Sequence, residues 1–262
     1  MKIGVTGCTS GIGLSLVKKL QANGDTVLSL GGSNSSRWRL GQRLPGDLNI
    51  DALIHLAHDR TLSVIENVEA ARTLCDSYNG PKVFLSSFSA HTKSRSRYGR
   101  SKFEIEKIFE QSKGSSLRAG IVYGQSVGGV FAQLEMLIKT LPVIPVPYSG
   151  SPLLFTTHID DLVEEIIATL RHCDGSTVFA ANAVPISLEE LIFQMQDQLG
   201  ESKPTILLWR QPLDQILKIL IRAFPNFPMA DSLLSLSNDT SYTELADMKI
   251  AMTSFRTFDL KP

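Results

Sequence analysis

A glycine-rich segment near the start of the chain, VTGCTSGIGLSLV at residues 5–17, restricts the fold more than any other feature. It follows the short apolar run KIGVTG and opens a stretch with apolar residues at helical spacing. Closely spaced glycines between a strand and a helix let the backbone approach a pyrophosphate, and the helix N-terminus supplies N–H groups and partial positive charge. The segment therefore predicts a dinucleotide-binding turn, with contacts from Gly7, Thr9, Ser10, Gly11, Ile12 and Gly13.

The first half of the chain alternates between short apolar runs and amphipathic stretches. Strands that are apolar throughout and separated by helices are typical of a parallel sheet covered on both faces. We therefore predict an α/β fold, a Rossmann-type doubly wound parallel sheet with a small C-terminal substrate-binding lobe. The strands are expected at 2–7, 25–32, 51–57, 82–87 and 116–124, and the helices at 13–24, 62–78 and 99–112.

The domain organisation follows from where this alternation weakens. We expect residues 1–125 to form the dinucleotide-binding Rossmann domain, with a later segment, roughly 155–182, returning to it. Residues 126–262 are expected to form mainly the smaller, substrate-binding lobe. An amphipathic helix is expected at 212–224, packed on the core or acting as a lid rather than docked on a membrane surface.

Composition narrows the classes of function. The 26 Lys and Arg residues equal the 26 Asp and Glu residues, and this balance argues against broad nucleic-acid binding. The three cysteines, Cys8, Cys75 and Cys173, lie far apart without metal-ligand spacing, which favours reduced thiols and no metal site. The N-terminal apolar run is too short for a signal-peptide core, and no run reaches the length of a membrane span. We therefore expect a cytoplasmic protein.

The segment after the second strand bears on which dinucleotide is bound. An acidic residue usually stands there and holds the adenosine ribose 2′-OH, but no Asp or Glu occurs between Asp25 and Asp47. Ser33 and Arg37 occupy the segment instead, and a hydroxyl and a guanidinium suit a 2′-phosphate. NADP is therefore slightly favoured over NAD. Asp47 and Leu48 are expected to border the adenine.

A second motif indicates proton transfer. The run KVFLSS ends in Ser86 and Ser87, at the edge of a doubly wound sheet where ligands bind. Tyr98 and Lys102 follow in YGRSK, one helical turn apart and therefore on one face of a helix. A nearby ammonium lowers the pKa of a tyrosine from about 10, so Lys102 can help Tyr98 to act as a general acid or base. Ser87 can hydrogen-bond the substrate oxygen while hydride moves to or from a nicotinamide.

The chain resembles the short-chain dehydrogenase/reductase superfamily, in its extended, sugar-nucleotide epimerase/dehydratase branch. The matching segments are TGCTSGIG, ALIHLAH, FLSSFSA, YGRSK, LRAGIVYG and HIDDL, in family order between residues 6 and 162. The resemblance implies that Tyr98 is the catalytic acid/base and Lys102 its partner, both also in contact with the cofactor. It implies that Ser87 orients the substrate oxygen.

The resemblance implies further contacts. Leu56 and Ala57 would border the cofactor, and Tyr123 would lie where the nicotinamide and the sugar meet. His91 follows the serine-ended strand closely and is a candidate substrate contact. The HIDDL segment, which starts at His158, would be mainly architectural and tie the smaller lobe to the sheet.

The resemblance also implies a reaction class, an NAD(P)-dependent sugar-nucleotide epimerase or reductase that transfers hydride at a hydroxyl or keto carbon. An epimerase oxidises and re-reduces one carbon with a retained cofactor, whereas a reductase uses NADPH once and releases it. The missing acidic residue favours the reductase, and the branch favours the epimerase. A non-catalytic NAD(P)-binding sensor or regulatory protein of the same fold is the alternative. A homodimer remains open.

Overall fold

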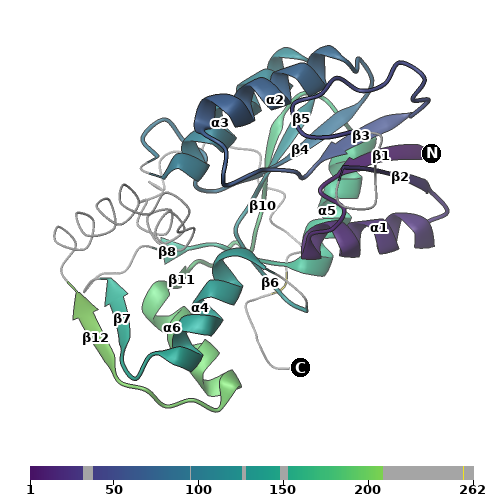
Figure 1. Cartoon of the computed structure of the whole chain (residues 1–262). Helices are drawn as coiled ribbons and strands as arrows, with labels where there is room; N and C mark the ends of the chain where they lie inside the picture. The colour runs from purple at the N-terminus through teal and green to yellow at the C-terminus, as the bar shows by residue number, and fades with distance from the viewer. Residues whose placement is uncertain (32–37, 95, 126–127, 148–152, 209–255, 257–262) are drawn as a thin grey trace.

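A six-stranded parallel sheet forms the centre of the molecule (Figure 1). The computed structural model describes residues 1–31, 38–94, 96–125, 128–147, 153–208 and 256. The strand order is β10-β5-β4-β3-β1-β2, and every neighbouring pair is parallel. The strands are β1 (Lys2–Thr6), β2 (Thr26–Leu30), β3 (Ala52–His55), β4 (Lys82–Ser87), β5 (Ser115–Ala119) and β10 (Thr177–Ala180). The predicted doubly wound α/β fold is confirmed.

Helices cover both faces of this sheet (Figure 1). Two pack together on one face, α1 (Gly11–Ala22) and α5 (Ile159–Arg171), and two on the other, α2 (Val64–Asp76) and α3 (Arg97–Gln111). Leu16 of α1 and Ile166 of α5 share one core cluster with the strands, while Phe109 of α3 packs on Phe84 of β4 in another. Each apolar helix face is therefore buried against an apolar strand face, which is why the strands lack polar alternation.

The direction of winding reverses at β1, which lies between β2 and β3. In open α/β sheets, ligands bind outside the carboxyl ends of the strands at such a switch point. The ends of β1 and β3 are held together there, because the backbone N–H groups of Leu56 and Ala57 donate to Thr6 Oγ1 at 3.1 and 3.2 Å. The fold thus places the crevice beside the glycine-rich turn.

The strand expected at 116–124 is two strands. The chain leaves the main sheet after β5, and the next strand, β6 (Ile121–Tyr123), pairs with β9 (Thr156–His158) in a separate sheet. The Gly120 N–H donates to Thr157 Oγ1 at 2.9 Å and the Ile121 N–H donates to Phe155 O at 2.7 Å. These bonds replace the ladder of the main sheet and direct the chain into the smaller lobe.

The smaller lobe has its own core. Phe131 and Leu134 of α4 pack with Leu191 and Met195 of α6 in a cluster distinct from those of the main sheet. Its strands form two-stranded sheets, β7 with β12 and β8 with β11. Its elements are α4 (Gly129–Thr140), β7 (Ile144–Pro147), β8 (Leu153–Leu154), β11 (Ile186–Ser187), α6 (Leu188–Leu199) and β12 (Thr205–Leu208).

Two expectations from the sequence concern the helices: one predicted helix, and the lack of a membrane span. The helix expected at 212–224 lies outside the described residues. Among the described helices, none combines the length and the apolar character that crossing a bilayer requires.

Candidate active site

The glycine-rich turn is closed by a serine cap. Ser10 Oγ accepts a hydrogen bond from the Gly13 N–H at 3.0 Å and donates one to Gly7 O at 2.9 Å. A Cβ at Gly13 would lie only 2.2 Å from Gly7 O and 2.8 Å from Cys8 Cα, so helix α1 can approach the turn this closely only with glycine there. Ser10 and Gly13 therefore determine the conformation of the turn between β1 and α1.

The N-terminus of α1 suits an anion. The first backbone N–H groups of a helix have no intrahelical partner and lie at the positive end of its dipole. No acidic side chain occupies the first turn of α1. Of the other predicted contacts in the turn, Thr9 is exposed and Gly11 and Ile12 are half-buried. This donor set fits the pyrophosphate of a dinucleotide.

The predicted cofactor border lies against this turn. A Cβ on Gly7, whose φ is +73°, would lie 3.0 Å from Ala57 N and 3.2 Å from Leu56 Cβ. The structure thus brings Leu56 and Ala57 together with the glycine-rich turn.

The adenosine end is described only in part. Ser33 and Arg37 lie outside the described residues. Asp47 is exposed, whereas Leu48 packs in a cluster with Leu30 and Trp38.

Tyr98 lies in the first turn of α3. This helix begins two residues before its expected start, because Ser96 caps it by accepting a hydrogen bond from the Gly99 N–H at 2.9 Å. A Cβ at Gly99 would lie 2.1 Å from Ser94 Oγ and 2.3 Å from Ser89 O. The serine-rich loop after β4 therefore packs directly on the helix start and sets the position of Tyr98.

Lys102 lies one turn further along the same face. Its side chain is buried, with 3% exposure, and its Nζ donates to Leu85 O of β4 at 2.7 Å. The Nζ lies 4.4 Å from the centre of the Phe84 ring and 5.5 Å from that of Tyr98. The structure therefore brings Tyr98 and Lys102 together near the carboxyl end of β4.

The electrostatics differ from our expectation that Lys102 lowers the pKa of Tyr98. Burial raises the pKa of Tyr98, and the cation that offsets part of this rise is Arg60. Burial and the nearby Arg60 charge lower the pKa of Lys102 to about 7, against the opposing effect of Glu106. Lys102 does not act as expected because burial removes water from its ammonium, which makes the charged form of Lys102 itself less stable.

The serines at the end of β4 present hydroxyl groups to this edge. Ser87 Oγ lies 3.1 Å from Ser89 Oγ and accepts a hydrogen bond from the Ser89 N–H at 3.3 Å. Ser86 Oγ is buried and has no hydrogen-bond partner within the described part of the chain. His91 follows in the same loop, where its Nδ1 accepts from the Lys93 N–H at 3.2 Å.

Sequence reasoning gave no role to His58 and Arg60, which follow β3. The His58 ring meets the Tyr98 ring edge-on at a centroid distance of 5.0 Å, and His58 Nε2 lies 3.2 Å from Ser101 Oγ. Arg60 Cζ lies 5.3 Å from the centre of the Tyr98 ring. Burial and the Lys102 charge lower the pKa of His58 to about 2, so its ring is neutral. The only sequence signal was the position of HLAHDR after a strand that ends at the crevice.

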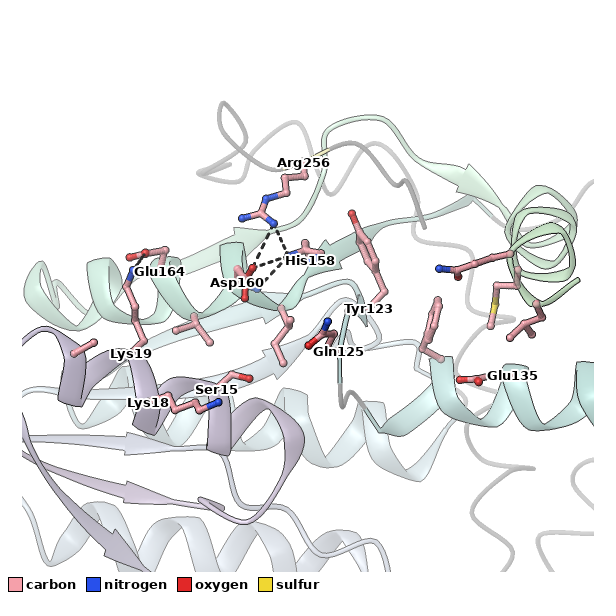
Figure 2. Close-up of a pocket in the computed structure, with 18 residues that line it drawn as sticks. Ser15, Lys18, Lys19, Tyr123, Gln125, Glu135, His158, Asp160, Glu164 and Arg256 are labelled. Atoms are coloured by element: carbon pink, nitrogen blue, oxygen red, sulfur yellow. Dashed lines mark hydrogen bonds and ion pairs between the residues drawn. The ribbon is translucent and has the colours of Figure 1, made fainter. Parts of the chain in front are cut away.

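Tyr123, the predicted substrate contact, lines a cavity away from Tyr98 and Lys102 (Figure 2). Its side chain is buried, and its ring lies 5.1 Å from the His158 ring and 6.4 Å from the Phe131 ring. The cavity has a volume of about 1250 Å³ and lies between α1 and α5 on one side and α4 and α6 on the other. Its lining includes none of Ser87, Tyr98 and Lys102.

The HIDDL segment starts helix α5 and contacts Arg256. His158 caps α5 by accepting from the Asp160 N–H, and Figure 2 shows Arg256 above both residues. Arg256 Nε lies 3.1 Å from Asp161 Oδ1, and the Arg256 backbone N–H donates to Asp161 Oδ2 at 2.8 Å. In the described ranges, no group of three or more His, Cys, Asp or Glu side chains could hold a metal ion.

Comparison with known proteins gave matches among solved structures. No protein-family model matches the chain, and no curated protein matches it. UDP-glucose 4-epimerase of Thermotoga maritima, solved with UDP-glucose, is 19% identical, with a TM-score of 0.62 over 80% of this chain and 87% of that one.

Two further matches were solved with a nicotinamide cofactor. The dTDP-glucose 4,6-dehydratase DesIV of Streptomyces venezuelae, with NAD bound, is 17% identical at a TM-score of 0.66 over 90% of this chain and 96% of that one. RMD of Pseudomonas aeruginosa, in complex with NADPH, is 17% identical, with a TM-score of 0.62 over 91% of this chain and 98% of that one. The chain therefore has the fold of nucleotide-sugar epimerase and dehydratase structures.

Proposed function

We propose that the chain is an NAD(P)-dependent enzyme that transfers hydride at a hydroxyl or keto carbon of a nucleotide-activated sugar, with Tyr98 as the proton shuttle. One observation carries the proposal: Tyr98 and the buried Lys102 lie close together near the carboxyl end of β4, in a sheet that also presents a glycine-rich turn. The matching structures solved with UDP-glucose, NAD or NADPH support this substrate class and this cofactor.

The cofactor would lie across the carboxyl ends of the strands. The N-terminus of α1, capped by Ser10, would hold the pyrophosphate, and Leu56 and Ala57 would border the chain of the dinucleotide. Lys102 and Tyr98 would contact the ribose next to the nicotinamide. The nicotinamide ring of a bound cofactor supplies or accepts the hydride.

The proton would move at the Tyr98 hydroxyl. Ser87 would hold the substrate oxygen by a hydrogen bond while Tyr98 gives it a proton or takes one from it. Burial raises the pKa of Tyr98, so at neutral pH the phenol keeps its proton. This state suits proton donation to a ketone, the direction of a reductase, and it requires Tyr98 to be ionised before the reverse reaction.

We further propose a slight preference for NADP over NAD, from Ser33 and Arg37 in a segment without acidic residues. The test is to denature the purified protein and identify the nucleotide it releases by mass and absorbance. A stoichiometric amount of NAD would mean a cofactor retained through turnover and would favour an epimerase. An empty protein that binds NADPH better than NADH would favour a reductase.

Tyr98→Phe tests the mechanism, because it keeps the ring and removes only the hydroxyl. Turnover of a nucleotide sugar should fall by about 10²–10⁴-fold, the usual contribution of a positioned proton donor, while cofactor affinity stays near that of the wild type. Tyr78→Phe is the matched control, since Tyr78 follows α2 and precedes the amino end of β4. Full activity in Tyr98→Phe would refute the mechanism.

The non-catalytic alternative predicts a different pattern. A sensor or regulatory protein of this fold would bind NAD(P) with no turnover of any nucleotide sugar, in the wild type as in Tyr98→Phe.

A further inference from the structure

Two cationic side chains lie near the ring of Tyr98. Arg60 Cζ lies 5.3 Å from the ring centre and Lys102 Nζ lies 5.5 Å from it, both within the range of cation–π attraction. They come from different elements, since Arg60 belongs to the loop after β3 and Lys102 to the second turn of α3. Distance alone therefore does not decide which charge acts on Tyr98.

The two side chains differ in how stable their charged forms are. Lys102 is buried and stacked on the Phe84 ring, and one of its protons is donated to Leu85 O at 2.7 Å. Burial lowers the pKa of Lys102 to about 7, so its ammonium is much less stable than that of an exposed lysine. Arg60 is exposed, and a guanidinium stays protonated throughout the working pH range. Arg60 therefore places a lasting positive charge over the Tyr98 ring.

Among the described residues, the two histidines near the pair are neutral, and Glu106 and Arg97 hydrogen-bond other groups. His58 faces Tyr98 as a neutral ring, and His55 on β3 is also neutral, because burial lowers its pKa to about 3. Glu106, one turn beyond Lys102, is held by Arg118 through two hydrogen bonds of 2.7 and 2.8 Å. Arg97, next to Tyr98, donates to Leu62 O at 3.4 Å.

We propose that Arg60 is the fixed positive charge of the site, which favours the ionised form of Tyr98 and the uncharged form of Lys102. A phenolate ring is richer in electrons than a phenol ring, so a cation over its face stabilises the ionised form. The same cation repels a proton on Lys102. Arg60 is thus a positioning residue that sets the pH range in which the pair exchanges a proton. The catalytic meaning of this inference depends on the proposed function.

The test compares three variants. Arg60→Gln removes the charge, Arg60→Lys keeps it, and Arg100→Gln removes an exposed charge from the same helix as Tyr98. The titration of Lys102 is followed by lysine side-chain NMR, assigned with Lys102→Met. That of Tyr98 is followed by tyrosinate absorbance after rapid pH jumps, as the difference from Tyr98→Phe. Circular dichroism verifies that each variant is folded.

In Arg60→Gln we expect both titration midpoints to rise by about 1 pH unit, which is tenfold in each acid constant. Arg60→Lys should return both toward the wild type, and Arg100→Gln should leave both unchanged. The pH profile of kcat/KM should move to higher pH in Arg60→Gln alone.

Unchanged midpoints in folded Arg60→Gln would overturn the inference, and so would an equal shift in Arg100→Gln. The inference and the proposed function can fail separately. If Tyr98→Phe keeps full activity while the midpoints depend on Arg60, the proposed function fails and the electrostatic role stands. If Tyr98→Phe is inactive and the midpoints are the same with and without the Arg60 charge, the proposed function stands and the electrostatic role fails.

Discussion

At the scale of single residues, Lys102 is costly to bury in its charged form. A buried ammonium loses its hydration, and one carbonyl bond with aromatic contacts replaces this only in part. The lowered pKa expresses that cost, since the folded chain holds the proton less tightly than the unfolded chain does. A residue kept at such a cost is typical of a functional site.

Lys102→Met should expose this cost as a pH dependence of stability. Between about pH 7 and pH 10 the unfolded chain binds the Lys102 proton and the folded chain does not, so the free energy of unfolding of the wild type should rise with pH in this window. Lys102→Met should lack that rise and be the more stable protein near pH 6. Urea unfolding across this range measures it, with Lys107→Met, an exposed lysine of α3, as control. An identical slope in Lys102→Met and the wild type would contradict the prediction.

Single residues also show where sequence reasoning stops. His55 lies within an apolar run, and the structure packs it as a core side chain against Phe84 and Phe109, with Thr6 Oγ1 2.8 Å from its Nδ1. That role follows from its neighbours in sequence. The role of Arg60 does not, because its contact with Tyr98 joins positions 38 residues apart through the meeting of a loop and a helix.

At the scale of elements, apolar runs predicted most of the main sheet. β4 spans the expected residues 82–87, because a run apolar on both faces has only one place in a covered parallel sheet. Element ends were less predictable. The expected strand at 116–124 breaks because Gly120 and Ile121 find hydrogen-bond partners in Phe155 and Thr157, more than thirty residues along the chain.

The pairing of Glu106 with Arg118 was equally hidden from sequence. It joins α3 to β5 by two hydrogen bonds between side chains that are less than 10% exposed, and it lies one turn beyond Lys102. The spacing of Tyr98, Lys102 and Glu106 places all three on one face of α3. The helical spacing thus indicated which residues share a face of α3. That this face pairs with β5 through Arg118 became clear only from the fold.

At the scale of the whole molecule, the segment from β9 to α5 connects the two cores. β9 pairs with β6, which leads into the smaller lobe, and α5 packs on α1 against the main sheet. Arg256 ties a distant part of the chain to this junction. Its backbone N–H and side chain both bind Asp161, and its carbonyl accepts from Asn182 Nδ2 at 2.7 Å.

Asp161 should matter more to this junction than the arginine charge. Arg256→Ala keeps the backbone bond to Asp161 and loses a half-exposed ion pair, so we expect a loss of about 0.2–1 kcal/mol in the free energy of unfolding. Asp161→Ala removes the partner of both bonds and an acidic side chain from the first turn of α5, which should cost about 1–3 kcal/mol.

Urea unfolding of the two single variants and the double variant measures these losses and their coupling. Because Arg256→Ala removes little once Asp161 is gone, the double variant should be close in stability to Asp161→Ala. Arg171→Ala, an exposed arginine at the other end of α5, is the control. If Asp161→Ala costs no more than Arg256→Ala, the side-chain ion pair rather than the backbone bond holds this part of the chain to α5.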